Sequence, residues 1–303
     1  MRGRVVWVDY ISVNEAAEKW GVTPRVARGY CEAGRVPGAF QTGRTWNIPA
    51  NAGKPARKPR KGKLPGTLLE RLRLEKESQL PGGIYHKVQV ELTYNSNHIE
   101  GSRLTHDQTR LIFETNTIGV ADLPVSADDV IETVNHFRCI DYVIDNANRM
   151  LSERMIKQLH LLLKSGTSDS RKSWFAVGEY KRLANEVGGG PTARPEEVPQ
   201  EMAKLVSGYN ENRAKTLEDV VAFHCDFESI HPFQDGNGRV GRLILFKECL
   251  CNGIVPFVIE DDIKQFYYRG LAEWRSERGY LMDTCLSAQD RFKERLDYFG
   301  IAY

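Results

Sequence analysis

The sequence has no apolar run long enough to cross a bilayer. A spanning helix needs about 18 consecutive apolar residues, and the first residues, MRGRVVWVDY, also lack the apolar core and cleavage site of a secretory signal. We therefore expect a cytoplasmic protein that makes no contact with a membrane. The six cysteines include no C-x-x-C pair, which argues against a zinc or dithiol site and favours free thiols.

Two common catalytic patterns are also missing. No H-E-x-x-H occurs, which excludes the zinc-protease pattern. The triple glycine at 188–190 is followed by proline and threonine rather than by Gly-Lys-Ser/Thr, which excludes a P-loop. Any nucleotide or metal site must therefore be built in another way.

Acidic residues are scarce in the first part of the chain. Residues 1–65 contain 13 Lys+Arg and 4 Asp+Glu, a balance of +9, although the whole chain carries only +2. The remaining chain is therefore acidic, at −7. A small basic module on an acidic body indicates that the module, rather than the body, meets nucleic acid.

The basic module has the pattern of two short helices followed by a hairpin. Ser12 is a predicted N-cap before a helix whose apolar residues fall at 13, 16, 17 and 20, and Gly21 ends that helix. Thr23 and Pro24 predict a second helix from Pro24 to Ala33. The segment AFQTGRTWNIP predicts two strands around Thr42-Gly43.

This segment, YISVNEAAEKWGVTPRVARGYCEAGRVPGAFQTGRTWNIPANAGKP, resembles the winged helix-turn-helix modules of the MerR and excisionase type. The resemblance implies that DNA would face the second helix and the wing. The residues concerned are Thr23, Arg25, Arg28, Arg35 and Arg44. The alternative is a docking or dimerisation element with solvated arginines.

The composition divides the chain into three segments. Residues 1–53 form the winged helix-turn-helix-like module, and residues 54–66 form a basic, proline-rich linker. Residues 67–303 have apolar spacings of three and four almost throughout, which predict a mostly α domain. Within it, residues 179–199 carry β-type residues around a Gly-Gly-Gly-Pro tip, which predict a hairpin among helices.

The segment HPFQDGNGRVGR, residues 231–242, carries the predicted chemistry. A glycine-rich turn that enters a helix offers backbone N–H groups to an anion. Arg239 and Arg242 add guanidinium groups suited to phosphate oxygens, and Asp235 is the carboxylate available to Mg²⁺. His231 has the chemistry of a general base. The spacing alone leaves phosphoryl transfer, nucleotidyl transfer and nucleotide binding open.

The same twelve residues match H-P-F-x-[DE]-G-N-[GK]-R-x-x-R, the motif of the Fic family, which the chain resembles over about residues 85 to 280. The resemblance implies that His231 is the catalytic base, that Asp235 holds Mg²⁺ or Mn²⁺, and that the substrate is ATP. The hairpin would be a flap that aligns a target segment. The implied nucleotide-binding residues are Glu186, Val187, Gly188, Gly236, Asn237, Gly238, Arg239, Val240, Gly241, Arg242, Tyr267 and Tyr268.

One position departs from the family pattern. Where some relatives have an asparagine that reaches the adenine, this chain has Arg275. The departure leaves the base preference open. Phosphate recognition does not depend on this position.

The segment SNHIEG, residues 96–101, resembles the inhibitory motif [ST]-x-x-x-E-[GN] of Fic proteins, with Ser96, Glu100 and Gly101 at the fixed positions. The resemblance implies that Glu100 pairs with Arg242 and blocks the γ-phosphate. The alternative is a helix end capped by Gly101 with a solvated glutamate.

The implied function is transfer of AMP from ATP to a Tyr, Thr or Ser hydroxyl of a target protein, with the protein itself among the candidates. Two alternatives remain at this point: removal of AMP by the same site, and a DNA-binding regulator whose Fic domain senses nucleotide. The implied partners are ATP, a target protein, and DNA through residues 1–66. The sequence leaves the oligomeric state open, a homo-oligomer included.

Overall fold

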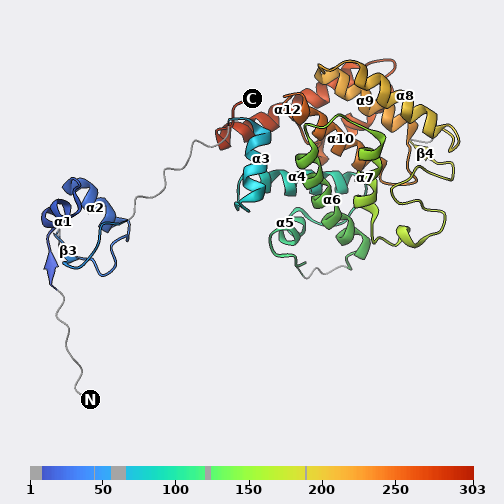
Figure 1. The fold of residues 1–303 in the computed structure, drawn as a ribbon. Helices are drawn as coiled ribbons and strands as arrows, with labels where there is room; N and C mark the ends of the chain where they lie inside the picture. The colour runs from blue at the N-terminus through green and yellow to red at the C-terminus, as the bar shows by residue number, and fades with distance from the viewer. Residues whose placement is uncertain (1–8, 44, 56–65, 120–123, 188–189) are drawn as a thin grey trace. The chain divides into compact units, whose positions relative to one another are not determined.

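The computed structural model describes residues 9–43, 45–55, 66–119, 124–187 and 190–303. The chain divides into two compact units, Met1–Leu64 and Pro65–Tyr303. Figure 1 shows the helices and strands of each unit. Arg44 and Gly188, two of the predicted site residues, lie outside the described residues.

The first unit contains two helices and a three-stranded antiparallel sheet of order β1-β3-β2. Its elements are β1 (Tyr10–Ile11), α1 (Val13–Trp20), α2 (Pro24–Glu32), β2 (Phe40–Thr42) and β3 (Thr45–Pro49). The register pairs Ile11 with Ile48 and Thr42 with Thr45. The helices and the hairpin therefore follow the residues that the apolar spacing predicts, although α2 ends one residue earlier.

Local capping explains the boundaries of these helices. The Ser12 side chain accepts from the Glu15 N–H and the Glu15 side chain accepts from the Ser12 N–H, which is a capping box. Thr23 caps α2 with its side chain alone, which accepts from the Val26 N–H. The buried side chains between the helices and the sheet are Val13, Ala16, Ala17, Trp20, Ala27, Cys31, Val36 and Ile48.

The second unit is mostly helical, as the sequence predicts. Its first helices are α3 (Leu68–Glu77), α4 (Ile84–Ile99), α5 (His106–Thr115), α6 (Ala127–Asn146) and α7 (Glu153–Lys164). After the hairpin of β4 (Glu186–Val187) and β5 (Gly190–Pro191), the remaining helices are α8 (Val198–Glu211), α9 (Leu217–Ile230), α10 (Asn237–Cys251), α11 (Lys264–Glu273) and α12 (Gly279–Phe299). Short 3₁₀ turns lie at Asp169–Arg171 and Asp261–Ile263.

Helix α10 lies at the centre of the second unit (Figure 1). It packs against α4, α6, α7 and α9, and every residue of it except Gly238 and Cys251 is buried. A helix that is buried all round carries its polar residues into the protein interior as well. The partners of those polar residues decide the geometry of the site.

Among the described residues, no helix combines the length and the apolar character that crossing a membrane requires. The longest described helix, α12, has buried residues on one face only, as is typical of a helix that packs on the surface of a globular domain.

The close approach of α11 and α12 generates a stability prediction. A Cβ atom at Gly270 would lie 2.7 Å from the Cα of Leu281 and 2.9 Å from its backbone nitrogen, so the helix axes would have to move apart. We expect Gly270→Ala to lower the free energy of unfolding by about 1–3 kcal/mol. Chemical denaturation of the purified protein measures this change.

The matched control is Gly208→Ala on α8, where a Cβ meets no atom within 4 Å. This substitution should raise the free energy of unfolding by about 0.4–1 kcal/mol, since alanine favours the helix. Equal effects of the two substitutions would contradict the close-packing argument.

Candidate active site

The site begins where α9 ends. His231 follows the last residue of α9 and adopts the left-handed conformation, with φ 51° and ψ 61°, while its N–H donates to the Phe227 carbonyl at 2.9 Å. Such a conformation costs a non-glycine residue roughly 1–2 kcal/mol. It turns the chain sharply, and the His231 side chain, 16% exposed, lines a cavity.

The loop between α9 and α10 is braced by its own residues. The Asn237 side chain accepts from the Phe233 N–H at 2.7 Å and donates to the Phe233 carbonyl at 2.8 Å. Asn237, one of the implied nucleotide-binding residues, therefore uses its side chain to hold the turn in shape. Gly236 has φ 83°, and a Cβ there would lie 3.3 Å from Leu163, so the turn requires glycine.

The amino terminus of α10 lacks a side-chain cap. The first N–H groups of a helix have no partner within the helix, and together with the helix dipole they favour an anion. The two arginines of the motif lie on the first turns of the same helix, and both are only 5% exposed. Backbone donors and guanidinium groups thus occupy one end of α10.

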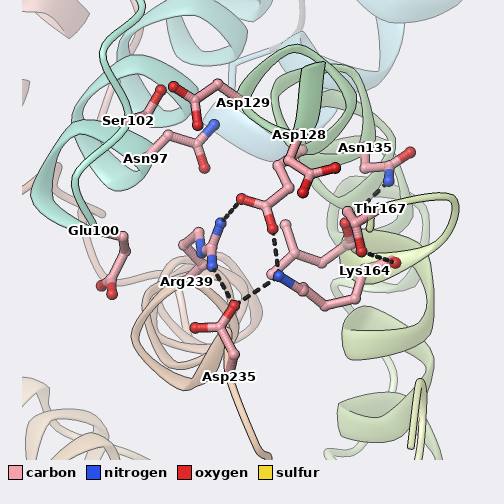
Figure 2. Close-up of polar contacts among 12 residues, drawn as sticks. Asn97, Glu100, Ser102, Asp128, Asp129, Asn135, Lys164, Thr167, Asp235 and Arg239 are labelled. Atoms are coloured by element: carbon pink, nitrogen blue, oxygen red, sulfur yellow. Dashed lines mark hydrogen bonds and ion pairs between the residues drawn. The ribbon is translucent and has the colours of Figure 1, made fainter. Parts of the chain in front are cut away.

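Arg239 and Asp235 belong to a charge cluster whose cations, Arg239 and Lys164, are buried (Figure 2). Arg239 Nη1 pairs with Glu132 on α6, and Arg239 Nη2 lies 3.1 Å from Asp235 Oδ2. Lys164 Nζ lies 2.6 Å from the same oxygen. Burial raises the pKa of Asp235, but Arg239 and Lys164 outweigh it and hold the value at about 2, so the carboxylate is ionised.

The residues fit a cation that arrives with a nucleotide. Mg²⁺ typically takes one or two carboxylates together with phosphate oxygens and water, and Asp235 supplies one carboxylate whose side chain is 46% exposed. Among the described residues, no group of three His, Cys, Asp or Glu side chains is arranged to hold a metal by itself.

Arg242 binds the segment that resembles the inhibitory motif. Its Nε donates to Ser96 Oγ at 3.0 Å, and its Nη2 donates to the Ser96 carbonyl at 2.9 Å and to Glu100 Oε1 at 2.7 Å. Glu100 directly follows α4, and Gly101 then turns the chain with φ 96°. A Cβ at Gly238 would lie 2.3 Å from Glu100 Oε1, so the carboxylate rests against the first turn of α10.

The loop opens into a cavity of about 770 Å³, a volume in the usual range of small-molecule sites. Its lining residues come from the residue after α4, the hairpin, α9, the turn at His231, α10 and α11: Glu100, Gly190, Pro191, Thr192, Cys225, Glu228, Ser229, His231, Gly238, Arg242, Tyr267, Tyr268, Arg269, Leu271 and Ala272. A neighbouring hollow of about 840 Å³ between α8 and α9 contains Arg275 but no residue of the loop.

The two tyrosines differ in their surroundings. Tyr267 is 1% exposed, and its hydroxyl lies 2.7 Å from His224 Nε2. Tyr268 is 42% exposed and donates to the Ile99 carbonyl at 3.1 Å. Tyr268 therefore joins α11 to the end of α4 beside Glu100.

Hydrogen bonds join the hairpin to the loop between α9 and α10. Register pairs Glu186 with Pro191 and Val187 with Gly190. Before it, Asn185 Nδ2 donates to the Phe233 carbonyl at 3.0 Å. The buried Lys181 donates to Asn185 Oδ1 and Thr192 Oγ1, both at 2.7 Å, and burial lowers its pKa to about 8.

Buried titratable groups surround His231. Burial lowers the pKa of His231, although the nearby Glu228 backbone opposes the shift. Burial raises the pKa of Glu228 to about 8 in spite of Arg242. Glu228 Oε2 lies 4.0 Å from His231 Nδ1, so a carboxyl that is mostly protonated near neutral pH stands behind the imidazole.

Sequence reasoning missed four residues of this site: Glu132, Lys164, Lys181 and Glu228. Glu228 carried a usable signal, because it lies three residues before His231 on a helix and therefore on nearly the same face. Lys164 carried none, since a lone lysine at the end of an apolar helix is ordinarily solvated.

A pH prediction follows from His136, which is fully buried behind the two arginines, with its Nδ1 3.0 Å from Thr93 Oγ1. Burial, then Arg239 and Arg242, lower its pKa to about 3. Below pH 6.5 the unfolded chain binds this proton and the folded chain does not. His136 should therefore lower the free energy of unfolding by about 1 kcal/mol for each unit that the pH falls from 6.5 towards 3.

Urea unfolding at pH 7.5, 6.5 and 5.5 measures this loss. The control His136→Asn keeps a polar partner for Thr93 and removes the imidazole, so its free energy of unfolding should fall less steeply with pH. Parallel pH dependence in the two proteins would contradict the assignment of this slope to His136.

Curated relatives of this sequence include proteins that are named as adenylyltransferases. Proteins named protein adenylyltransferase Fic from Drosophila grimshawi and Drosophila melanogaster are each 27% identical over 186 residues, which is 59% of this chain and 36% of each relative. The chain thus spans about a third of the length of those relatives.

Solved structures share the fold. A Fic domain containing signaling protein from Bacteroides thetaiotaomicron aligns with a TM-score of 0.60 and 24% identity, over 77% of this chain and 97% of the other. Fic-1 from C. elegans aligns with a TM-score of 0.61 and 19% identity, over 77% of this chain and 70% of the other. The Fic/DOC family profile matches residues 150–248. The chain therefore contains a domain of the Fic/DOC family.

Proposed function

We propose that the protein transfers AMP from ATP to a Tyr, Thr or Ser hydroxyl of a target protein. One observation carries the proposal: His231, the amino terminus of α10 and Arg242 share one cavity. A proton acceptor thus lies beside a set of anion donors, which is what in-line transfer of a nucleotidyl group requires. The names of the curated relatives support the same reaction.

The reaction assigns a role to each part of the loop. The N–H groups of α10, with Arg239 and Arg242, bind the phosphates of ATP. The target hydroxyl attacks the α-phosphorus, His231 accepts its proton, and pyrophosphate leaves as the bond to the α-phosphorus breaks. Since the pKa of His231 is lowered by burial, the imidazole is neutral and ready to accept a proton at neutral pH.

Asp235 would hold Mg²⁺ or Mn²⁺ through its exposed side chain. A cation held there would neutralise the negative charge that builds up on the departing phosphates. The protein contributes position and electrostatics, as is usual in phosphoryl transfer.

We further propose that Glu100 inhibits this reaction in the resting protein. Its carboxylate accepts from Arg242 at 2.7 Å and rests against Gly238, so it occupies donors that a phosphate would use. ATP bound without Arg242 would present its α-phosphorus in the wrong direction for attack. The ion pair is 5% and 29% exposed on its two sides, which keeps it from being screened as a surface pair is.

Replacement of Glu100 tests both proposals. Glu100→Gly frees Arg242, and the loss of a charge-assisted contact of about 1.5–3 kcal/mol corresponds to roughly a ten- to hundredfold change in phosphate binding. We expect AMP transfer, measured with labelled ATP as self-modification and as modification of lysate proteins, to rise by at least that factor. ATP, GTP, CTP and UTP are compared because Arg275 leaves the base preference open.

Two further variants serve as controls. Adding His231→Ala to Glu100→Gly should abolish transfer while nucleotide binding stays within a few-fold. Glu77→Gly changes an exposed glutamate at the end of α3 and should leave transfer at the wild-type level. Transfer in Glu100→Gly no faster than in the wild type, with the fold intact, defeats the inhibition proposal, and undiminished transfer in the double variant defeats the role of His231.

We propose that the first unit binds duplex DNA. Arg25 and Arg28 are exposed and lie three residues apart on α2, so they project from nearly the same face. Arg35 instead lies over the Tyr30 ring, 4.8 Å from its centroid. Together with the +9 balance of residues 1–65, these exposed arginines favour DNA binding over a role in docking alone.

The salt dependence of DNA binding tests this second function. The full chain should bind duplex DNA with an affinity that falls steeply as salt rises, and Arg25→Ala with Arg28→Ala should reduce the slope of log affinity against log salt by about 2. Arg110→Ala with Arg213→Ala removes the same charge from the second unit and should leave the slope unchanged. No DNA binding even at about 50 mM salt would favour the docking alternative.

A further inference from the structure

A buried lysine holds the carboxylate that would bind the metal. Lys164 is the last residue of α7, its side chain is 2% exposed, and its ammonium contacts Glu132, Asp169 at 3.2 Å and Asp235 at 2.6 Å. An ammonium has three donors, so all of them are used. Figure 2 shows Lys164 and Arg239 converging on one oxygen of Asp235 while the other oxygen points away from both.

The charges in this cluster balance. Three carboxylates, on Glu132, Asp169 and Asp235, face three cations. The cations are Lys164, Arg239, which contacts Glu132 and Asp235, and Lys172, which contacts Asp169 at 2.6 Å. A divalent cation that approached Asp235 alone would therefore meet a carboxylate whose charge is already neutralised, next to two fixed positive groups.

A nucleotide changes this balance. Its phosphates bring several negative charges to the end of α10 and additional oxygen ligands for the cation. The cation would then have the negative charge and the additional oxygen ligands that Asp235 alone does not supply. Since Lys164 and Arg239 both bind Oδ2, the carboxylate keeps its other oxygen for the cation and keeps its orientation.

We propose that Lys164 is a positioning residue for Asp235: its ammonium fixes one carboxylate oxygen and supplies the positive charge that a free divalent cation would otherwise supply, so that the cation binds only together with the nucleotide. The proposal rests on the role of Asp235 proposed above. Partners of a metal ligand commonly tune metal binding in this way. A lysine that only joined α6 to α7 would affect stability without affecting metal binding.

Binding of Mn²⁺ to the full chain without nucleotide tests the proposal, with free Mn²⁺ measured by electron paramagnetic resonance. Lys164→Met removes the ammonium and leaves three carboxylates against only two cations, Arg239 and Lys172, so we expect Mn²⁺ to bind at least tenfold more tightly than to the wild type. Adding Asp235→Asn should remove most of that gain. Lys164→Arg keeps a cation and should bind Mn²⁺ as weakly as the wild type does.

Lys247→Met is the matched control. Lys247 is another buried lysine, 1% exposed and paired with Glu248, but it donates to the Arg149 carbonyl rather than to the loop. Its replacement should lower the free energy of unfolding and leave Mn²⁺ binding unchanged. Tighter Mn²⁺ binding in this variant, equal to that in Lys164→Met, would overturn the proposal.

Two further results would overturn it. One is Lys164→Met binding Mn²⁺ no more tightly than the wild type. The other needs no Lys164 variant: wild-type protein that binds Mn²⁺ without nucleotide more tightly than about 0.1 mM, in a manner abolished by Asp235→Asn.

A separate measurement distinguishes failure of the metal role proposed for Asp235 from failure of the role proposed for Lys164. With a non-hydrolysable ATP analogue present, Asp235→Asn should weaken Mn²⁺ binding to the protein. If it does not, the metal role of Asp235 fails and the role of Lys164 fails with it. If it does, the comparison of Lys164→Met with the wild type decides the role of Lys164 alone.

Discussion

The site depends on the burial of two arginines at the amino terminus of α10. Arg239 and Arg242 are each 5% exposed, and a buried guanidinium is tolerated only when it is paired and hydrogen-bonded. Glu132 on α6 pairs with the first, and Ser96 and Glu100 at the end of α4 pair with the second. The docking of α4 and α6 on α10 is therefore tied to the two arginines of the motif.

The same burial sets the protonation of the surrounding groups. Burial keeps His136 and His224 neutral, each with a pKa of about 3, helped by Arg239 and Arg242 at His136 and by Arg242 at His224. No further positive charge therefore collects behind the loop. Burial also keeps Glu228 largely protonated beside His231. Positive charge is thereby concentrated at the end of α10, where an anion would bind.

Two side chains hold opposite charges at this end of α10. Glu100 brings a carboxylate to Arg242 and the first turn of the helix, and Lys164 brings an ammonium to Asp235. In the proposed function these are the places of a phosphate and of its cation. The resting protein thus balances its own loop with charges of the same sign as those of the substrate complex, and buried charges need such partners.

The sequence determined the elements whose causes are local. Caps at Ser12 and Thr23 begin α1 and α2, the apolar spacing predicts the helices of the second unit, and the loop 231–242 is defined by its own glycines and proline. Only the tertiary structure decided the partners of the charged residues. Lys164 meets Asp235 across 71 positions, and Arg239 meets Glu132 across 107. Periodicity shows which face of a helix is buried but not which side chain lies opposite, so the charges of the loop were predictable and their neutralisation was not.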